Sequence, residues 1–308
     1  MRKLNYADFR KRIDPIFDVM EDTNSISYQL IGLSDLFQKI ATIYKFALEH
    51  PNSSFHNSII FQVVESALLY GVCVPIRRLA DGGQINEISL FKIVHELKGS
   101  CIHWTRKEFV TWDGQSYETS ELRRQHREEV DRLLKDNMKK GILAAWVPRG
   151  EHEESDRRHE TFDLLSKTSS PSLRSPSDRC DLNFPNYLLS ILHANTRNVS
   201  QFANRHLVHR VHLRDQIPQF NVSLKTIEET INSLYYCFNI LNSVFTGGHM
   251  SPDLVHQYDI FDKLSLALVE EADQQAIADE YEIIKARMEA AVNAHDRTWM
   301  SDLQKFST

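Results

Sequence analysis

The stretch "SISYQLIGLSDLFQKIATIYKFALEH", residues 25–50, indicates the fold class of this chain. Its apolar side chains recur at spacings of three and four, at Leu30, Leu33, Phe37, Ile40, Ile43 and Ala47. This spacing places them on one face of a long helix. Residues 223–245 repeat the pattern, with Ser223 as N-cap, and residues 55–81 are apolar almost all round, as in a buried helix.

β-type patterns are scarce in the remainder of the chain. The one candidate for a short strand or turn is "EFVTWDGQSYET", residues 108–119, and only 10 of the 308 residues are glycine. "NEISLFKIVHELKG" predicts a short helix capped by Ser89 or Asn86. The sequence therefore predicts an all-α protein.

Two segments between these helices differ in character. Residues 117–141 form a charged helical pattern with opposite charges at i,i+4 spacing, typical of a solvated face. Residues 147–183 lose helical periodicity and become rich in Ser and Pro, which predicts a long surface loop. "TGGHMSPD" then marks a boundary before an acidic, helical tail.

Composition limits the classes of protein that fit. The chain is 42% hydrophobic and 25% charged, as in ordinary globular domains. Its four cysteines form no CxxC pair, which argues against a disulfide framework or a thiolate zinc site and suits a reducing compartment. No signal peptide and no run of 18 apolar residues is present, so we expect a cytoplasmic protein without a membrane span. The net charge of -6 does not exclude nucleic acid, because a local basic patch matters more than the total.

The stretch "FANRHLVHRVHLRD", residues 202–215, concentrates three histidines, three arginines and an asparagine in one helical pattern. It continues a predicted helix over 186–214. The stripe expected on that helix comprises Leu188, Leu192, Asn195, Val199, Phe202, His206, His209 and Leu213. Three interpretations are open for the stretch: a metal site, an acid/base site for a phosphate-containing substrate, or a solvated basic face.

Residue chemistry separates the first two interpretations. Two imidazoles at i,i+3 or i,i+4 can chelate zinc, but here no Glu general base is near and three arginines repel a cation, so we expect no metal and no cofactor. Cutting RNA without metal needs a base for the 2′-hydroxyl proton, which histidine supplies near neutral pH. It also needs cations for the charge that grows on the phosphate, which arginine supplies.

The segment "ANRHLVHR", residues 203–210, resembles the signature helix of the HEPN superfamily, whose pattern is often R-N-x-x-x-A-H. Three further segments are similar to the abortive-infection, AbiU-like branch: "SDLFQKIATIYKFALEH", "VPIRRLADGGQINEISLFKIVHEL" and "SLKTIEETINSLYYCFNILNSVF". Together they cover most of residues 25–245. Asn204 matches the polar residue of the motif and His209 its histidine, whereas Ala203 stands where the motif arginine is expected.

The resemblance implies a HEPN-like helical bundle over residues 1–248, with an insertion at about 98–183 and a C-terminal helical extension at 249–308. It also implies a homodimer and a metal-independent endoribonuclease of abortive infection, antiviral defence or a toxin–antitoxin system, with RNA as substrate and a protein partner or antitoxin. The catalytic candidates are His209, Arg205, Asn204 and His212. The substrate-binding candidates are Arg210, His206, Arg214 and Arg78.

Two alternatives stay open on these residues. Arg205 and His212 also satisfy an Arg-x6-His spacing, so either His209 or His212 can be the catalytic group. Ala203 favours a degenerate HEPN protein that acts as a dimeric RNA- or protein-binding module. In "IRRLAD", Arg77 or Arg78 either pairs with Asp81 to hold the helix end or reaches the cleft to replace the missing charge.

Overall fold

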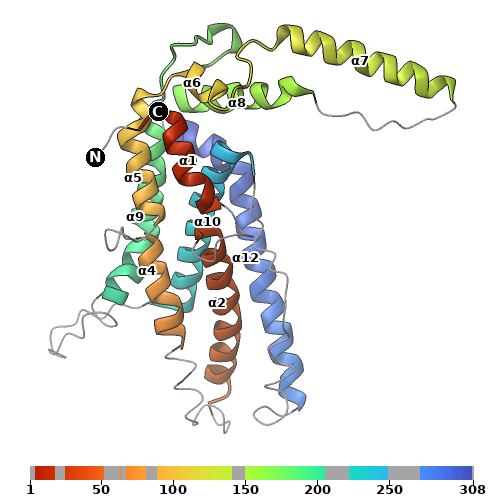
Figure 1. Ribbon diagram of the computed structural model, residues 1–308. Helices are drawn as coiled ribbons and strands as arrows, with labels where there is room; N and C mark the ends of the chain where they lie inside the picture. Colours follow the sequence, from red (N-terminus) through yellow and green to blue (C-terminus); the bar gives the residue numbers. More distant parts are fainter. Residues whose placement is uncertain are drawn as a thin grey trace. The chain divides into compact units, whose positions relative to one another are not determined.

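The computed structural model is built from helices (Figure 1). It describes residues 4–17, 25–51, 63, 67–80, 89–140, 150–204, 222–248 and 271–306. The α-helices within these ranges are α1 (Tyr6–Phe17), α2 (Ile26–Glu49), α4 (Val74–Ala80), α5 (Leu90–Ser100), α6 (Arg106–Thr111), α7 (Ser120–Lys139), α8 (Glu151–Ser166), α9 (Asn183–Phe202), α10 (Leu224–Thr246) and α12 (Glu271–Phe306). Short turns of other helix types are η1 (Leu68–Cys73), η2 (Cys101–His103) and η3 (Pro171–Leu173). The predicted all-α class is confirmed.

The chain divides into two compact units. Unit 1 comprises residues 1–11 and 97–184, and unit 2 comprises residues 12–96 and 185–308. The larger part of unit 1, residues 97–184, nearly coincides with the insertion expected at about 98–183. The tail, which the sequence analysis set apart as an extension, contributes α12 to unit 2, where it packs on α10 and α2.

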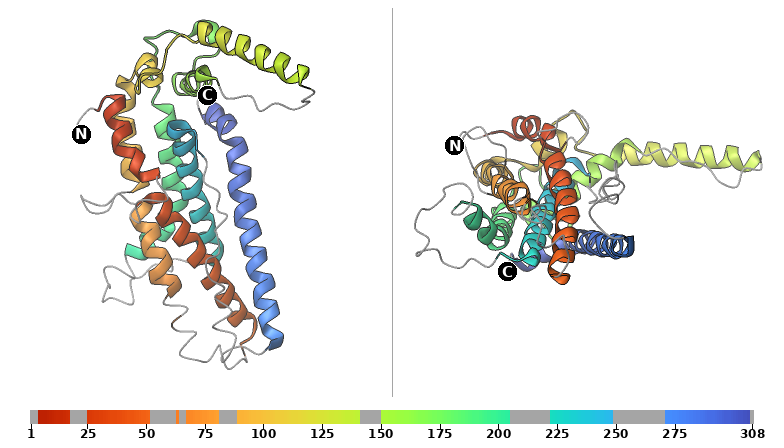
Figure 2. Two further views of the ribbon diagram at one scale, coloured as in Figure 1. Left: turned by 45° about the vertical axis from the view of Figure 1, so that its right-hand side comes forward. Right: turned by 90° about the horizontal axis from the view of Figure 1, so that it is seen from below.

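The core of unit 2 is centred on α10, which contacts α12, α2 and α4 (Figure 2). Leu234, Tyr235, Cys237 and Phe238 of α10 are fully buried, so this helix is covered on several sides. Serine hydroxyls cap the helix starts, as predicted for Ser89, which accepts from Lys92 N at 3.2 Å, and for Ser223, which accepts from Thr226 N at 3.1 Å. Ser25 caps α2 in the same way and accepts from Tyr28 N at 3.1 Å. Gly247 ends α10 with a φ of 73°, a conformation that favours glycine.

The long loop predicted over 147–183 is wrong in its first part, because residues 151–166 of unit 1 form α8. The helix lacks a simple apolar stripe because it buries Ser155, Arg158 and His159 beside Phe162 and Leu165. Buried polar groups are stable when their hydrogen bonds are satisfied within the protein, and they hide the periodicity that signals a helix.

Of the short strand or turn expected over 108–119, the strand is wrong and the turn is present, where Gly114 N donates to the carbonyl of Thr111 at 3.0 Å. Residues 106–111 form α6, which starts with reciprocal capping bonds between Thr105 and Glu108. The only β-type contact in the described ranges is an isolated antiparallel bridge between Thr105 and Arg179. The charged helix predicted at 117–141 is present as α7, and none of its residues is buried. Among the described helices, none has the length and apolar character needed to cross a bilayer.

Candidate functional site

Most of the predicted catalytic segment lies outside the described residues. This holds for His206, His209, His212, Arg205, Arg210 and Arg214, and also for Asp81. Asn204 is half-buried and directly follows α9 and Ala203, at the edge of the described range. Helix α9 therefore fixes the point from which the motif segment continues.

The buried stripe of α9 differs from the predicted one. Leu188, Leu192 and Val199 are buried as expected, but Asn195 is exposed and Phe202 is only half-buried. Thr196 and Ala203 take their places on the buried face. The buried face therefore runs from Leu192 to Thr196 and from Val199 to Ala203, each a step of four residues. The Thr196 hydroxyl donates to the carbonyl of Leu192.

Ala203, which stands where the resemblance to the HEPN motif leads us to expect an arginine, has a fully buried side chain. A guanidinium group at this point of α9 would lie in the interior of unit 2. An unpaired charge in such a place is strongly unfavourable. A small apolar residue such as Ala203 therefore suits this buried site better than the arginine of the motif.

A cavity of about 690 Å³ lies along α9, where exposed and buried residues of the helix meet. Its described lining is Ala80 at the end of α4 and, on α9, Ser190, His193, Ala194, Thr196, Arg197, Ser200 and Gln201. His193 and Arg197 are exposed and one helical turn apart. None of these lining residues is acidic, and within the described part of the chain Arg197 has no ion-pair partner. The cavity therefore offers a guanidinium group and an imidazole to a ligand.

Buried polar atoms occur at this cavity and at the helix end beside it. Among the described residues, the Oγ of Ser200, which is 3% exposed, has no hydrogen-bond partner, and neither has the buried Nε of Arg77 in the last turn of α4. Arg78 is exposed, and neither arginine belongs to the described lining of the cavity. The hypothesis that Arg78 supplies the missing charge stays a prediction.

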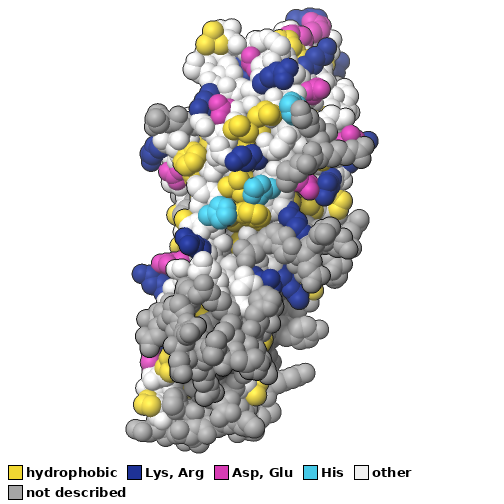
Figure 3. Space-filling model, turned by 90° about the vertical axis from the view of Figure 1, so that its left-hand side faces the viewer, with side chains coloured by type: hydrophobic (Ala, Val, Ile, Leu, Met, Phe, Trp, Pro, Cys, Tyr) yellow, Lys and Arg dark blue, Asp and Glu magenta, His cyan; other side chains and the backbone are white. Residues whose placement is uncertain are grey.

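Sequence reasoning missed His193 and Arg197, which lie in "LHANTR" before the motif. Their i,i+4 spacing was a signal, but the density of charge at 202–215 was stronger. Figure 3 shows a side of the molecule on which histidines lie among hydrophobic and basic side chains.

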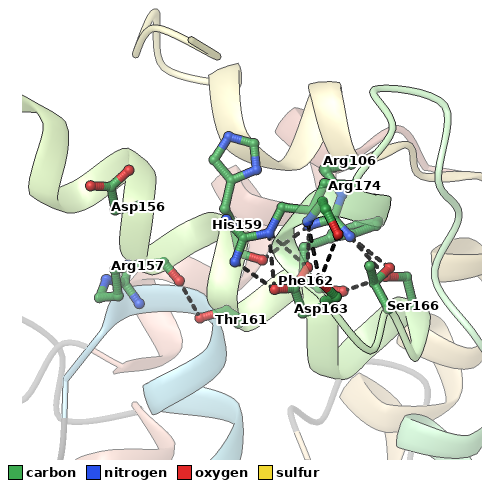
Figure 4. A network of polar contacts seen from close by, with 12 residues as sticks. Arg106, Asp156, Arg157, His159, Thr161, Phe162, Asp163, Ser166 and Arg174 are labelled. Atoms are coloured by element: carbon green, nitrogen blue, oxygen red, sulfur yellow. Dashed lines mark hydrogen bonds and ion pairs between the residues drawn. The ribbon is translucent and has the colours of Figure 1, made fainter. Parts of the chain in front are cut away.

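Unit 1 contains a second concentration of arginine and histidine, drawn in Figure 4. Arg106 is fully buried and donates to Asp163 at 2.7 Å and Asp178 at 2.9 Å. It also donates to the hydroxyls of Ser166 and Thr168 and to the carbonyl of His159. A second arginine, Arg174, donates to Asp163 at 2.6 Å. Because carboxylates and neutral oxygens accept from this buried guanidinium, the cluster is closed to a ligand.

His159 in α8 is held as a neutral side chain. Its Nε2 lies 3.0 Å from the carbonyl oxygen of Tyr117, so Nε2 must carry the proton. The Nδ1 atom is buried and has no hydrogen-bond partner. Burial lowers the pKa of His159, and the positive charges of Arg174 and Arg106 act in the same direction. This histidine is a poor candidate for acid/base catalysis because neither nitrogen can reach a substrate.

The cysteines are free and buried. Burial raises the pKa of the Cys73 thiol to about 12. A hydrogen bond with Cys101, with burial as the second cause, raises the pKa of Cys180 well above its ordinary value. Reactive cysteines have lowered pKa values, so these thiols are not nucleophiles.

Comparison of the chain with protein-family models, with curated proteins and with solved structures found no match in any of the three.

Proposed function

We propose that this chain is a metal-independent endoribonuclease of HEPN type, acting in antiviral defence or a toxin–antitoxin system. The observation that carries the proposal is the cavity on α9. The helix that leads into the 204–214 segment lines a volume of about 690 Å³ with His193 and Arg197 and, among its described residues, with no carboxylate. Such a lining favours an anionic substrate, because arginine matches phosphate geometry and no fixed negative charge opposes it.

The proposed chemistry uses the motif residues in defined roles. His209 takes the proton of the RNA 2′-hydroxyl, and the 2′-oxygen attacks the adjacent phosphorus. The P–O5′ bond breaks, and His212 or His206 protonates the departing 5′-oxygen, leaving a 2′,3′-cyclic phosphate and a 5′-hydroxyl. Arg205 stabilises the charge on the phosphoryl oxygens. Asn204 orients the reacting groups, and Arg210, Arg214 and Arg78 bind flanking phosphates.

A homodimer would make this set more effective. Two motif helices that face one shared cleft double the number of imidazoles, and cleavage requires both a base and an acid. A protein partner such as an antitoxin would act by covering that cleft. Sedimentation of the purified chain measures the dimer directly.

The full burial of Ala203 favours a second candidate function, a non-catalytic module that binds RNA or a protein. Without the motif arginine, the transition-state charge has one cation fewer. The binding chemistry of Arg197 and His193 does not depend on that arginine.

One experiment separates the two functions. A mixed RNA pool is incubated in excess EDTA with the wild type and with the double variant His209→Ala, His212→Ala. The matched control is His126→Ala, His152→Ala in unit 1, whose two rings lie 5.2 Å apart on α7 and α8. The nuclease proposal expects cleavage in EDTA by the wild type and by the control, and none by the motif variant. A folded wild-type dimer that binds RNA without cutting it would instead support the binding module.

A further inference from the structure

An aromatic cluster adjoins the cavity in unit 2. The Phe91 ring of α5 lies 4.4 Å from the ring of His95 at an angle of 58°, and 5.2 Å from the ring of His193 at 84°. Phe91 and His95 are half-buried and His193 is exposed. His193 belongs both to this cluster and to the cavity lining, so the aromatic surface and the cavity are continuous.

An exposed arginine lies one helical turn from the His193 ring of the cluster. Arg197 follows His193 by one turn of α9, is exposed, and lacks an ion-pair partner within the described ranges. The carboxylate nearest in sequence to His95 is Glu96, and Arg12 holds it at 2.8 Å. The fixed positive charge of Arg197 is therefore available to a ligand.

The cavity also contains neutral hydrogen-bonding groups. Ser200 presents a buried hydroxyl that has no hydrogen-bond partner in the part of the chain that the structure describes. Gln201 and Ser190 lie on the same lining, and the Ser190 hydroxyl donates to the carbonyl of Tyr187 at 2.7 Å. Hydroxyl and amide groups of this kind suit the sugar and phosphate oxygens of a nucleotide.

A cation beside an aromatic cluster and neutral donors is the combination that single strands require. Unpaired bases stack on aromatic side chains while their phosphates contact arginine, whereas a duplex hides its base faces and a free phosphate makes no use of aromatic rings. We infer that the surface formed by Phe91, His95, His193 and Arg197 binds a single-stranded segment of RNA, with a base on the rings and a phosphate on Arg197. This inference rests on the proposed function, because it names the form of RNA that the enzyme accepts.

The test is binding of a fluorescent 2′-O-methyl RNA 12-mer, followed by anisotropy at several salt concentrations. This probe cannot be cleaved, because its 2′-oxygen carries no proton. Arg197→Ala is expected to weaken binding about tenfold and to reduce the slope of log K against log salt by about 0.7, the value for one phosphate contact on a single strand. Phe91→Leu, which keeps an apolar side chain, is expected to weaken binding about fivefold or more.

The matched control is Arg132→Ala on α7, which removes an arginine whose side chain is 72% exposed. It should bind within about twofold of the wild type, because the change lies in unit 1. Unlabelled single-stranded RNA should displace the probe, and inorganic phosphate or duplex RNA should not. The inference is overturned if the wild type does not bind the probe, if Arg197→Ala and Phe91→Leu bind as tightly as the wild type, or if phosphate or duplex competes equally well.

Failure of this inference and failure of the nuclease proposal give different results. Cleavage in EDTA that depends on the motif histidines but not on Arg197 or Phe91 would retain the nuclease and reject this surface. Binding that depends on Arg197 and Phe91, without any cleavage, would retain the surface and reject the nuclease.

Discussion

Unit 1 and unit 2 each bring arginine and histidine together, but with opposite consequences. In unit 1, Arg106 is fully buried between Asp163 and Asp178, and His159 is neutral with no nitrogen free for a substrate. In unit 2, Arg197 and His193 are exposed on a cavity whose described lining contains no carboxylate. The same residue types therefore stabilise a fold in one unit and are available for a ligand in the other.

The presence of carboxylates explains this difference. A buried guanidinium is tolerated only when acceptors replace its hydration, so Arg106 needs the two aspartates that also neutralise it. An exposed guanidinium keeps its water and needs no partner. A cluster of basic residues is a stronger candidate for anion binding when it is open and unpaired than when it is merely dense.

The largest expected effect is the loss of Arg106. Arg106→Ala would leave Asp163 and Asp178 partly buried without this cation, and we expect a loss of about 3–5 kcal/mol in the free energy of unfolding. Arg197→Ala is the matched control and should change stability by less than about 0.5 kcal/mol. Urea unfolding of the full chain, followed by tryptophan fluorescence, measures both. Equal losses in the two variants would contradict the distinction between the units.

The second prediction concerns the motif position on α9. Ala203→Arg introduces the arginine of the HEPN motif that the sequence resembles, but at a fully buried site. We expect a loss of about 3 kcal/mol or more in unfolding free energy, from overpacking and from burial of an unpaired charge, and no gain in RNA cleavage. Ala203→Ser is the conservative control, with a smaller loss. A stable Ala203→Arg protein with increased cleavage would show that the arginine reaches the active site.

These two sites also show how far sequence reasoning extends. Local signals predicted the helices well, since the Ser89 and Ser223 caps and the stripe of α2 depend on neighbouring residues. The signals failed for α8, where buried Arg158 and His159 replace apolar residues. Their hydrogen-bond partners, such as Asp113 and the carbonyl of Tyr117, lie far along the chain.

The candidate site was predictable only in part. Residue types and spacing pointed to α9 and to Asn204, which follows it, because the motif consists of residues close together in the sequence. The cavity was not predictable, because Ala80 meets α9 more than 100 residues later in the chain. A shift of the buried stripe from Asn195 to Thr196 is also decided by packing and not by composition.

The third prediction tests the paired charges of unit 1 by acidification. The hydrogen bond from Arg158 lowers the pKa of Asp113, and the pKa values of Glu154 and Asp156 are lowered as well. A lowered carboxyl pKa contributes stability above the unfolded value of about 4 that is lost as pH falls through the folded value. We therefore expect wild-type stability to fall below about pH 4, and Asp113→Asn to be less stable at pH 7 with a shallower decline. An unchanged slope in this variant would mean that the pair contributes nothing to acid sensitivity.

The smallest expected effect is the titration of His159. Its lowered pKa means that the unfolded chain binds a proton more readily than the folded one, so stability is fully present above the unfolded pKa of about 6.5 and declines as pH falls through the folded value. His159→Gln keeps an N–H donor for the carbonyl of Tyr117 but cannot titrate, and we expect its stability to change less between pH 7 and 5. His193→Gln is the matched control, the same substitution at an exposed position in unit 2. The prediction is contradicted if the stability of His159→Gln falls between pH 7 and 5 as much as that of the wild type, while the stability of His193→Gln does not.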